Sequence, residues 1–201
     1  MVLTDKEISK LVTESNIIEN YNEENLQAVS YDICASNVIQ VFNRIQGTVD
    51  LRSKESIKLS NKEVFIDYGY KIMPGEYILV KTKEKFNMTA DLTGHIRPRT
   101  TFTRLGLVLS DQHINPTFSG HLYLGFFNAT PNAIEIFPEL IIGQIVFEKI
   151  SGDITENLLY KNKKDAKYQN EDSFIFPQIS DEITEDIIDQ YQKMKSKIFG
   201  V

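Results

Sequence analysis

The chain has 201 residues with a formal net charge of −6, and 41% of its residues are hydrophobic and 25% charged. This length supports one sizeable core and is short for two full domains. The acidic balance excludes a broad basic surface for a nucleic-acid backbone, so a small anion held by a local cation cluster is the better candidate ligand.

The cysteine and histidine content narrows the expected chemistry further. The only cysteine, Cys34, has no intrachain partner and is expected to be a buried, small apolar residue. The three histidines come without a CxxC or HExxH spacing, so we expect no zinc site. Because the sequence shows neither a signal-peptide pattern nor an apolar run of about 18 residues, we expect a cytoplasmic protein that spans no membrane.

Residues 3–15 have the pattern of a short N-terminal helix. Thr4 and Glu7 have the spacing of a capping box, in which each side chain bonds to the other residue's backbone N–H. Ile8, Leu11 and Val12 follow at helical intervals and would form the buried face.

From residue 30 to residue 150 the sequence predicts a mainly β fold. Short apolar or alternating runs succeed one another: YDICASNVIQVF, SIKLS, EVFID, EYILVKT, GHIRP, LGLVLS, HLYLGFFN, AIEIF and IIGQIVFEKI. Turn signals such as MPGE, NPTFSG and TPNA separate them, which is typical of a sandwich or barrel rather than of βαβ units. Within HLYLGFFN, Gly125 interrupts a strand and predicts a bulge or a close approach by a neighbouring group.

The chain changes character after residue 150. A polar stretch runs to FIFP, and a segment that begins with Ser180 and Asp181 then has the spacing of an amphipathic C-terminal helix. The apolar stripe of that helix comprises Ile183, Ile187, Ile188, Tyr191, Met194 and Ile198. We therefore expect a domain over residues 1–180 and a helical extension over residues 181–201, with the stripe packed on the protein's own assembly or available to a partner.

The segment GHIRPRTTFTRLGL concentrates positive charge and hydroxyl groups. Arg97, Arg99 and Arg104 alternate with threonines in a chain that is otherwise acidic. Guanidinium and hydroxyl groups suit phosphate oxygens, so the segment is a candidate anion site. A solvated turn whose arginines pair with surface carboxylates remains the alternative.

Several of these segments together resemble one family. RPRTTFTRLGL is similar to the arginine-hydroxyl-hydroxyl motif of the dCTP deaminase branch of the trimeric dUTPase superfamily. LTDKEI, NEENLQAVSYDI, MPGEYILVKTKEKFNMTADLTGHI, INPTFSGHLYLGFFN, PELIIGQIVFEKISG and YKNKKDAKYQNE resemble further family segments in the same order. The resemblance covers residues 3–177, and the helix after Ser180 has no obvious counterpart.

The resemblance implies a distorted β-barrel or jelly-roll subunit of the dUTPase-like type. It implies a homotrimer that binds a deoxynucleoside triphosphate of the dCTP or dUTP class between neighbouring chains, with Mg²⁺ carried on the triphosphate, and no nucleic-acid or membrane partner. The residues that the family pattern assigns to substrate are Arg99, Thr100, Thr101 and Arg104 for the phosphates; Asn115, Phe118, Leu122 and Tyr123 for sugar and base; and Tyr160, Lys167 and Glu171 in a covering tail. Thr100 and Arg104 would also take part in catalysis, and the tail would stay mobile until a ligand binds.

Three positions depart from the family pattern. The glutamate that shuttles protons in family deaminases would lie at position 125, where this chain has Gly125. Asn115 replaces an aspartate and cannot act as a base, and Glu171 replaces a glutamine and would favour a donor edge such as an amino group.

Two hypotheses follow from these departures. In the first, the protein is a pyrimidine nucleotide deaminase or a dUTPase-like hydrolase with a rearranged site, in which Asp111, His113 or Glu171 supplies the missing group. In the second, it has lost the chemistry and is a nucleotide-binding regulator or a partner-binding module.

Overall fold

The computed structural model describes residues 1–179 and 185–199. In those two ranges no helix combines the length and the apolar character needed to cross a membrane. The N-terminal helix α1, Asp5–Ser15, forms as the sequence predicts, with both bonds of the capping box between Thr4 and Glu7 in place. Ile8 is buried, and Leu11 and Val12 pack against the core.

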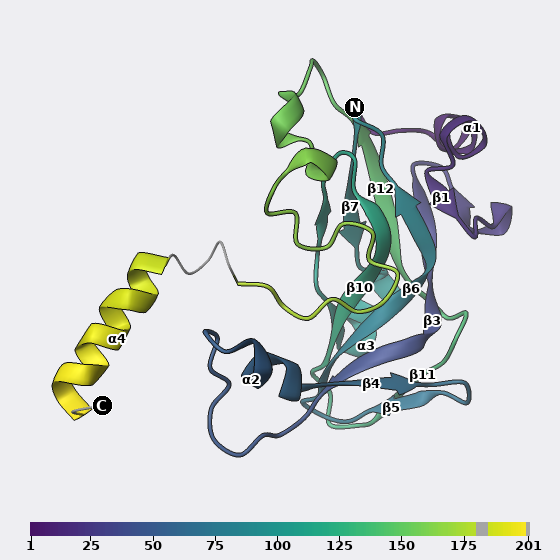
Figure 1. Cartoon of the computed structure of the whole chain (residues 1–201). Helices are drawn as coiled ribbons and strands as arrows, with labels where there is room; N and C mark the ends of the chain where they lie inside the picture. The colour runs from purple at the N-terminus through teal and green to yellow at the C-terminus, as the bar shows by residue number, and fades with distance from the viewer. Residues whose placement is uncertain (180–184, 200–201) are drawn as a thin grey trace.

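Antiparallel strands form the body of the molecule (Figure 1). Their bounds are β1 Ile18–Glu19, β2 Leu26–Gln27, β3 Ser30–Phe42, β4 Asn61–Phe65, β5 Tyr70–Ile72, β6 Tyr77–Asn87, β7 Leu92–Arg97, β8 Leu107–Leu109, β9 His113–Ile114, β10 Ser119–Asn128, β11 Ile134–Ile136 and β12 Ile141–Lys149. The main sheet has the order β8-β10-β6-β3-β12-β7-β9, with β1 beside β6 and with β2 and β4 beside β3, while β11 pairs with β5. The predicted mainly β architecture is confirmed.

The two faces of the sheet differ sharply along β6. Ile78, Val80 and Phe86 are fully buried and alternate with partly exposed residues, as expected for a strand with one face in the core. The outward positions include Tyr77, Leu79, Lys81 and Lys85. Strand β10 pairs with β6 so that Tyr123 lies opposite Lys81, and Gly125 opposite Leu79. This outer face of β6 and β10 is where the candidate site lies.

Some local predictions were wrong. The run SIKLS reads as an alternating strand, but it belongs to helix α2, Lys54–Leu59, whose N-cap Ser53 accepts a hydrogen bond from the Ser56 N–H. Five residues are too few for periodicity alone to separate a strand from one helical turn, and the capping serine decides the outcome here. The arginine-threonine segment forms another short helix, α3, Thr100–Leu105, which ends at Gly106 with φ 81°.

Cys34 is buried as predicted, and its thiol accepts a hydrogen bond from the Asn25 amide. The neighbouring carboxylate of Glu84 points into the core, where it accepts the Cys34 N–H. Burial raises the pKa of Glu84 to about 7.

After β12 the chain covers the sheet and then leaves it. Two short 3₁₀ turns, Glu156–Leu158 and Tyr160–Asn162, lead into a tail that crosses in front of β10 (Figure 1).

Helix α4, Glu185–Phe199, stands to one side of the strands, which confirms a C-terminal helix. Ile183 and the side chain of Ile188 lie outside what the structure describes. The other stripe residues, Ile187, Tyr191, Met194 and Ile198, are exposed. The Arg52 guanidinium stacks over the Tyr191 ring, with its Cζ atom 3.7 Å from the ring centroid. Whether an assembly covers this stripe stays a prediction.

Candidate functional site

A cavity of about 430 Å³ lies between the outer face of β10 and the tail. Six residues that the sequence assigned to nucleotide binding line it together: Asn115, Phe118, Leu122, Tyr123, Tyr160 and Glu171. The remaining lining comes from Leu79, Gln112, His113, Ile114, Tyr168, Phe174, Ile175 and Pro177. Aromatic rings therefore supply much of the wall, and a few polar groups converge between them, which is the usual composition of a small-molecule site.

Two polar side chains are buried in the wall of this cavity. Tyr123 and Glu171 are each 7% exposed. The Tyr123 hydroxyl has no hydrogen-bond partner among the described residues, although a buried hydroxyl ordinarily has one. Burial and the nearby Glu171 charge both raise the pKa of Tyr123, so the phenol stays protonated and can donate a hydrogen bond. The ring itself is held in place edge to face by Phe174, with centroids 5.0 Å apart.

Backbone bonds attach the tail to the beginning of β10. Asn170 N–H donates to Ser119 O at 2.7 Å, and His121 N–H donates to Glu171 O at 2.9 Å. Gly120 permits this approach, because a Cβ there would lie 2.8 Å from the Glu171 nitrogen. The tail therefore lies against the beginning of β10. Its mobility before a ligand binds stays a prediction.

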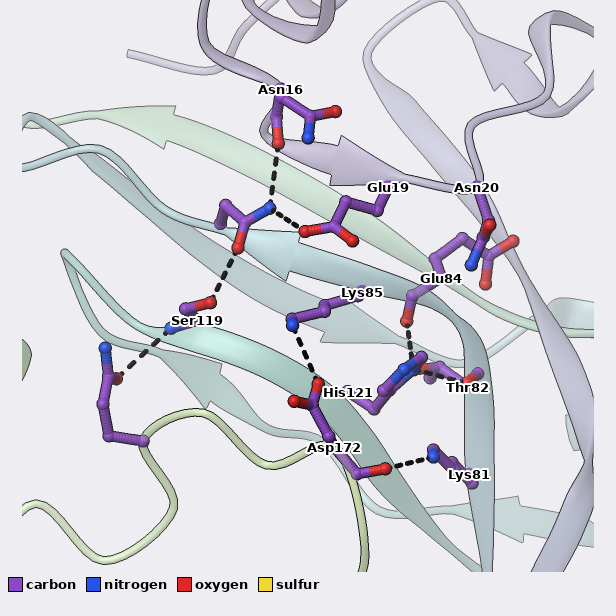
Figure 2. Close-up of polar contacts among 12 residues, drawn as sticks. Asn16, Glu19, Asn20, Lys81, Thr82, Glu84, Lys85, Ser119, His121 and Asp172 are labelled. Carbon is purple, nitrogen blue, oxygen red and sulfur yellow. Dashed lines mark hydrogen bonds and ion pairs between the residues drawn. The ribbon is translucent and has the colours of Figure 1, made fainter.

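Side chains of β6 strengthen the same attachment. Figure 2 shows Lys81 and Lys85 directed at Asp172, which follows Glu171 in the tail. Lys85 forms an ion pair with the Asp172 carboxylate at 2.8 Å, and Lys81 donates to the Asp172 carbonyl oxygen. Ser119 and Asn87 connect the beginning of β10 to the end of β6 through a 2.7 Å hydrogen bond. We call this set of contacts, made by Lys81 and Lys85 to Asp172, the tail clamp.

The arginine segment lies apart from the cavity in a single chain. None of Arg99, Thr100, Thr101 and Arg104 lines the cavity. Arg99 forms an ion pair with the buried Asp32 at 2.5 Å. Thr100, Thr101 and Arg104 are exposed on α3, and Arg104 has no ion-pair partner in the described part of the chain.

The surface-pair alternative holds for Arg97, which pairs with Asp111 at 3.0 Å. This pairing also occupies Asp111, which does not line the cavity. His113 does line it, with its ring 5.1 Å from that of His95.

Gly125 has a close neighbour of its own. A Cβ built on Gly125 would lie 1.9 Å from the Tyr77 hydroxyl and 2.8 Å from Ser110 Oγ. Of the two predicted alternatives, a bulge or a close approach, the close approach is the one found at Gly125, and Tyr77 makes it. The irregularity in strand pairing lies earlier in β10, between His121 and Tyr123. The space that a side chain at position 125 would need is thus filled by a tyrosine from the neighbouring strand.

Sequence reasoning missed several residues of the site. Tyr168 and Phe174 line the cavity from the tail, and their aromatic character in a polar stretch was an available signal. Tyr77 and Asp32 act through contacts between distant strands, so no local pattern indicates them. Lys167 is half-buried in the tail but does not line the cavity.

No group of three or more His, Cys, Asp or Glu in residues 1–179 and 185–199 is arranged to hold a metal ion.

Comparison with known proteins gives one consistent result. Residues 2–150 match the family model described as dCTP deaminase-like. A dCTP deaminase from Pseudoalteromonas translucida is 28% identical over 195 residues, covering 90% of this chain and 100% of the relative. A dUMP-forming dCTP deaminase from Corynebacterium glutamicum strain R is 30% identical over 175 residues, covering 85% and 92%.

Among solved structures, a 2'-deoxycytidine 5'-triphosphate deaminase from Agrobacterium tumefaciens superposes with a TM-score of 0.61 at 19% identity. The match covers 75% of this chain and 49% of that one, so this chain spans about half the length of the solved protein. At this identity the superposition supports the fold alone.

Proposed function

The chain belongs to the dCTP deaminase-like family, and from that premise we propose that it binds a pyrimidine deoxynucleoside triphosphate of the dCTP or dUTP class. The base and sugar occupy the cavity between β10 and the tail. The observation that carries this proposal is that six residues, drawn from two distant segments and matched to the family's nucleotide contacts, converge on one cavity. Stacking on its aromatic walls and bonds to Tyr123 and Glu171 suit a flat, polar heterocycle.

The triphosphate is held by a neighbouring chain. Thr100, Thr101 and Arg104 are exposed on α3 and away from the cavity of their own chain, which favours a site completed between the subunits of a homotrimer. Arg104 supplies an uncommitted guanidinium, whereas the charge of Arg99 is already balanced by Asp32. Mg²⁺ is coordinated by the phosphate oxygens of the nucleotide and accompanies it into the site, because phosphates and water supply most of the Mg²⁺ ligands in nucleotide sites.

Position 125 contributes no acid to this site. A glycine carries no proton-transfer group, and Tyr77 takes up the space beside it. Loss of a positioned general acid or base typically lowers the rate by about 10² to 10⁴. This filled space at Gly125 favours a second candidate function. In that function the protein is a regulator that binds a nucleotide without catalysis.

Binding is tested by ligand-induced stabilisation. The protein is melted with dCTP, dUTP or ATP in the presence of Mg²⁺, because a ligand that binds the native state adds about 2.7 kcal/mol of stability at a hundred times its Kd. We expect stabilisation by a pyrimidine deoxynucleotide and a loss of roughly tenfold or more in its affinity in Arg104→Ala. Arg44→Ala, which removes an exposed arginine far from the cavity in the sequence, is the matched control. Absence of stabilisation by every pyrimidine deoxynucleotide overturns the proposal.

A further inference from the structure

Glu171 is the carboxylate of the cavity. Among the described residues it is the only Asp or Glu that lines the space between β10 and the tail. Its Oε1 accepts the Ile175 N–H at 2.9 Å, which fixes the side chain without neutralising it. The other candidates for a relocated acid are less suitable, because Asp111 is paired with Arg97 outside the cavity and His113 is exposed at its rim.

The position of Glu171 is fixed from both sides of the residue. Its own carbonyl oxygen accepts the His121 N–H, and the preceding Asn170 donates to Ser119. The following residue, Asp172, is held by the tail clamp of Lys81 and Lys85 (Figure 2). A group that must act on a bound molecule benefits from such rigid support, because small displacements reduce its effect strongly.

The surroundings of Glu171 favour proton exchange near neutral pH. Burial raises its pKa to about 7, while the Ile175 N–H and the charge of Lys81 act in the opposite direction. From β10 it faces the protonated Tyr123, and His121, Lys85 and Asp172 lie in the adjoining attachment of the tail. Both forms of the carboxyl group are therefore populated at neutral pH, as an acid–base group requires.

We propose that Glu171 is the general acid–base residue of this site and that the molecule it acts on is a pyrimidine with an amino group at C4, carried on a deoxynucleoside triphosphate. This inference rests on the nucleotide binding proposed above. It gives the site a proton-transfer group in the tail, although position 125 has none.

The proton balance of the reaction is simple. The Glu171 carboxylic acid gives its proton to ring N3, and the resulting carboxylate takes a proton from a water molecule whose oxygen forms a bond to C4. The same carboxyl group then passes that proton to the amino nitrogen and receives the remaining hydroxyl proton. The C4–N bond breaks, ammonia leaves, C4 becomes a carbonyl, N3 keeps its proton and Glu171 returns to its acid form.

The Tyr123 hydroxyl provides the complementary contact. It is buried without a partner in the described part of the chain, so a ligand acceptor such as a ring carbonyl would satisfy it. The pair then holds the pyrimidine in one orientation, with a donor from Tyr123 on one side and the carboxyl of Glu171 on the other.

The test measures ammonia release and dCTP binding on the same preparations. Wild-type protein with dCTP and Mg²⁺ is expected to release ammonia, with kcat falling as pH rises above about 7, because the acid form of Glu171 starts the reaction. Glu171→Gln, whose amide oxygen can still accept the Ile175 N–H, should lower kcat by about 10² to 10⁴ while dCTP binding stays measurable. Glu156→Gln removes an exposed carboxylate of the same tail and is the matched control.

The outcomes separate this inference from the binding proposal. Binding of dCTP by the wild type without ammonia release, or equal turnover in Glu171→Gln, overturns the role of Glu171 and leaves nucleotide binding standing. A turnover rate independent of pH between about 6 and 8 also overturns it. Absence of any pyrimidine nucleotide binding overturns both.

Discussion

Tyr123 illustrates how a single side chain can be placed for a ligand rather than for stability. Its hydroxyl is buried beside the cavity and has no partner in the described residues. A buried hydroxyl in this state destabilises the unliganded fold by about 1 to 3 kcal/mol.

We therefore expect Tyr123→Phe to stabilise the unliganded protein by about 1 kcal/mol and to weaken nucleotide binding. Urea unfolding measures the first effect, and titration with dCTP measures the second. Tyr68→Phe, at a fully exposed tyrosine, controls for the loss of a hydroxyl as such. Lower stability in Tyr123→Phe would indicate that the hydroxyl already has a partner in solution.

Gly125 and Tyr77 are coupled through the space that they share. Because a Cβ at position 125 would overlap the Tyr77 hydroxyl, Gly125→Glu should destabilise the fold by about 1 to 3 kcal/mol. Tyr77→Ala removes the obstacle, so the double variant should be more stable than the sum of the single effects predicts, by at least about 0.5 kcal/mol. Denaturant unfolding of the four proteins in the cycle measures this coupling. Strict additivity would show that Tyr77 moves out of the way without loss.

At the residue scale, the sequence identified the functional positions better than their partners. Phe118, Tyr160 and Glu171 could be assigned from the family motifs, and they meet in the cavity. The pairing of Arg99 with Asp32 and the contact of Tyr77 with Gly125 could not, since each joins residues that are distant in sequence and depends on strand register.

At the scale of elements, the strand pair β6–β10 and the tail form one unit. The outward residues of β6 meet the tail through the clamp on Asp172, and the beginning of β10 meets it through backbone bonds. The Lys85–Asp172 pair is partly exposed, so solvent screens the attraction between its two charges. The backbone bonds from Asn170 and His121 act beside it in holding the tail.

Replacing both lysines with methionine tests this unit. In the Lys81→Met, Lys85→Met variant we expect the amides of Asn170 and His121 to exchange with deuterium a few-fold faster, roughly two- to fivefold, because the tail loses its side-chain contacts to β6. Core amides such as that of Phe147 should keep their rates. Lys62→Met on β4, where the lysine is exposed, serves as the control. Unchanged exchange at Asn170 would mean that backbone bonds alone hold the tail.

Element types were predictable where a pattern was long or capped. The periodicity of α1 and the alternation of β6 predicted both correctly. The short run SIKLS was misread because one turn of helix and one short strand bury apolar residues at similar spacings. The attachment of the tail was not predictable, because its polar composition suggests a solvated linker until the clamp lysines on β6 are seen.

For the whole molecule, the two halves of the proposed site lie on different parts of one chain. The cavity is built by β10 and the tail, whereas α3 carries the exposed Thr100, Thr101 and Arg104 elsewhere. In the proposed arrangement, a nucleotide that uses both surfaces contacts two chains. The mainly β architecture could be predicted from the spacing of the strands, but no pattern in a single sequence reveals which surfaces meet in an assembly.

Mixing two defective variants tests this arrangement. Arg104→Ala impairs the phosphate contact, and Asn115→Trp blocks the cavity at an exposed position of its lining. Each variant alone should bind little dCTP. If sites form between chains, mixed trimers should regain about a quarter of the wild-type sites. In an equal mixture, half of the chains carry an intact cavity and the other half an intact phosphate-binding surface, and neighbouring chains combine at random. Equilibrium dialysis after co-refolding counts them. A mixture that binds no more than its components would place the whole site within one chain.

The crowding of Gly125 by Tyr77 also bears on how this protein can change by mutation. A glutamate acquired at position 125 alone would clash with the tyrosine, and loss of the tyrosine alone would leave a gap beside Phe42 and Ser110. Each single change is unfavourable, and only the two changes together make room for a side chain at position 125. The two positions are therefore expected to change as a pair.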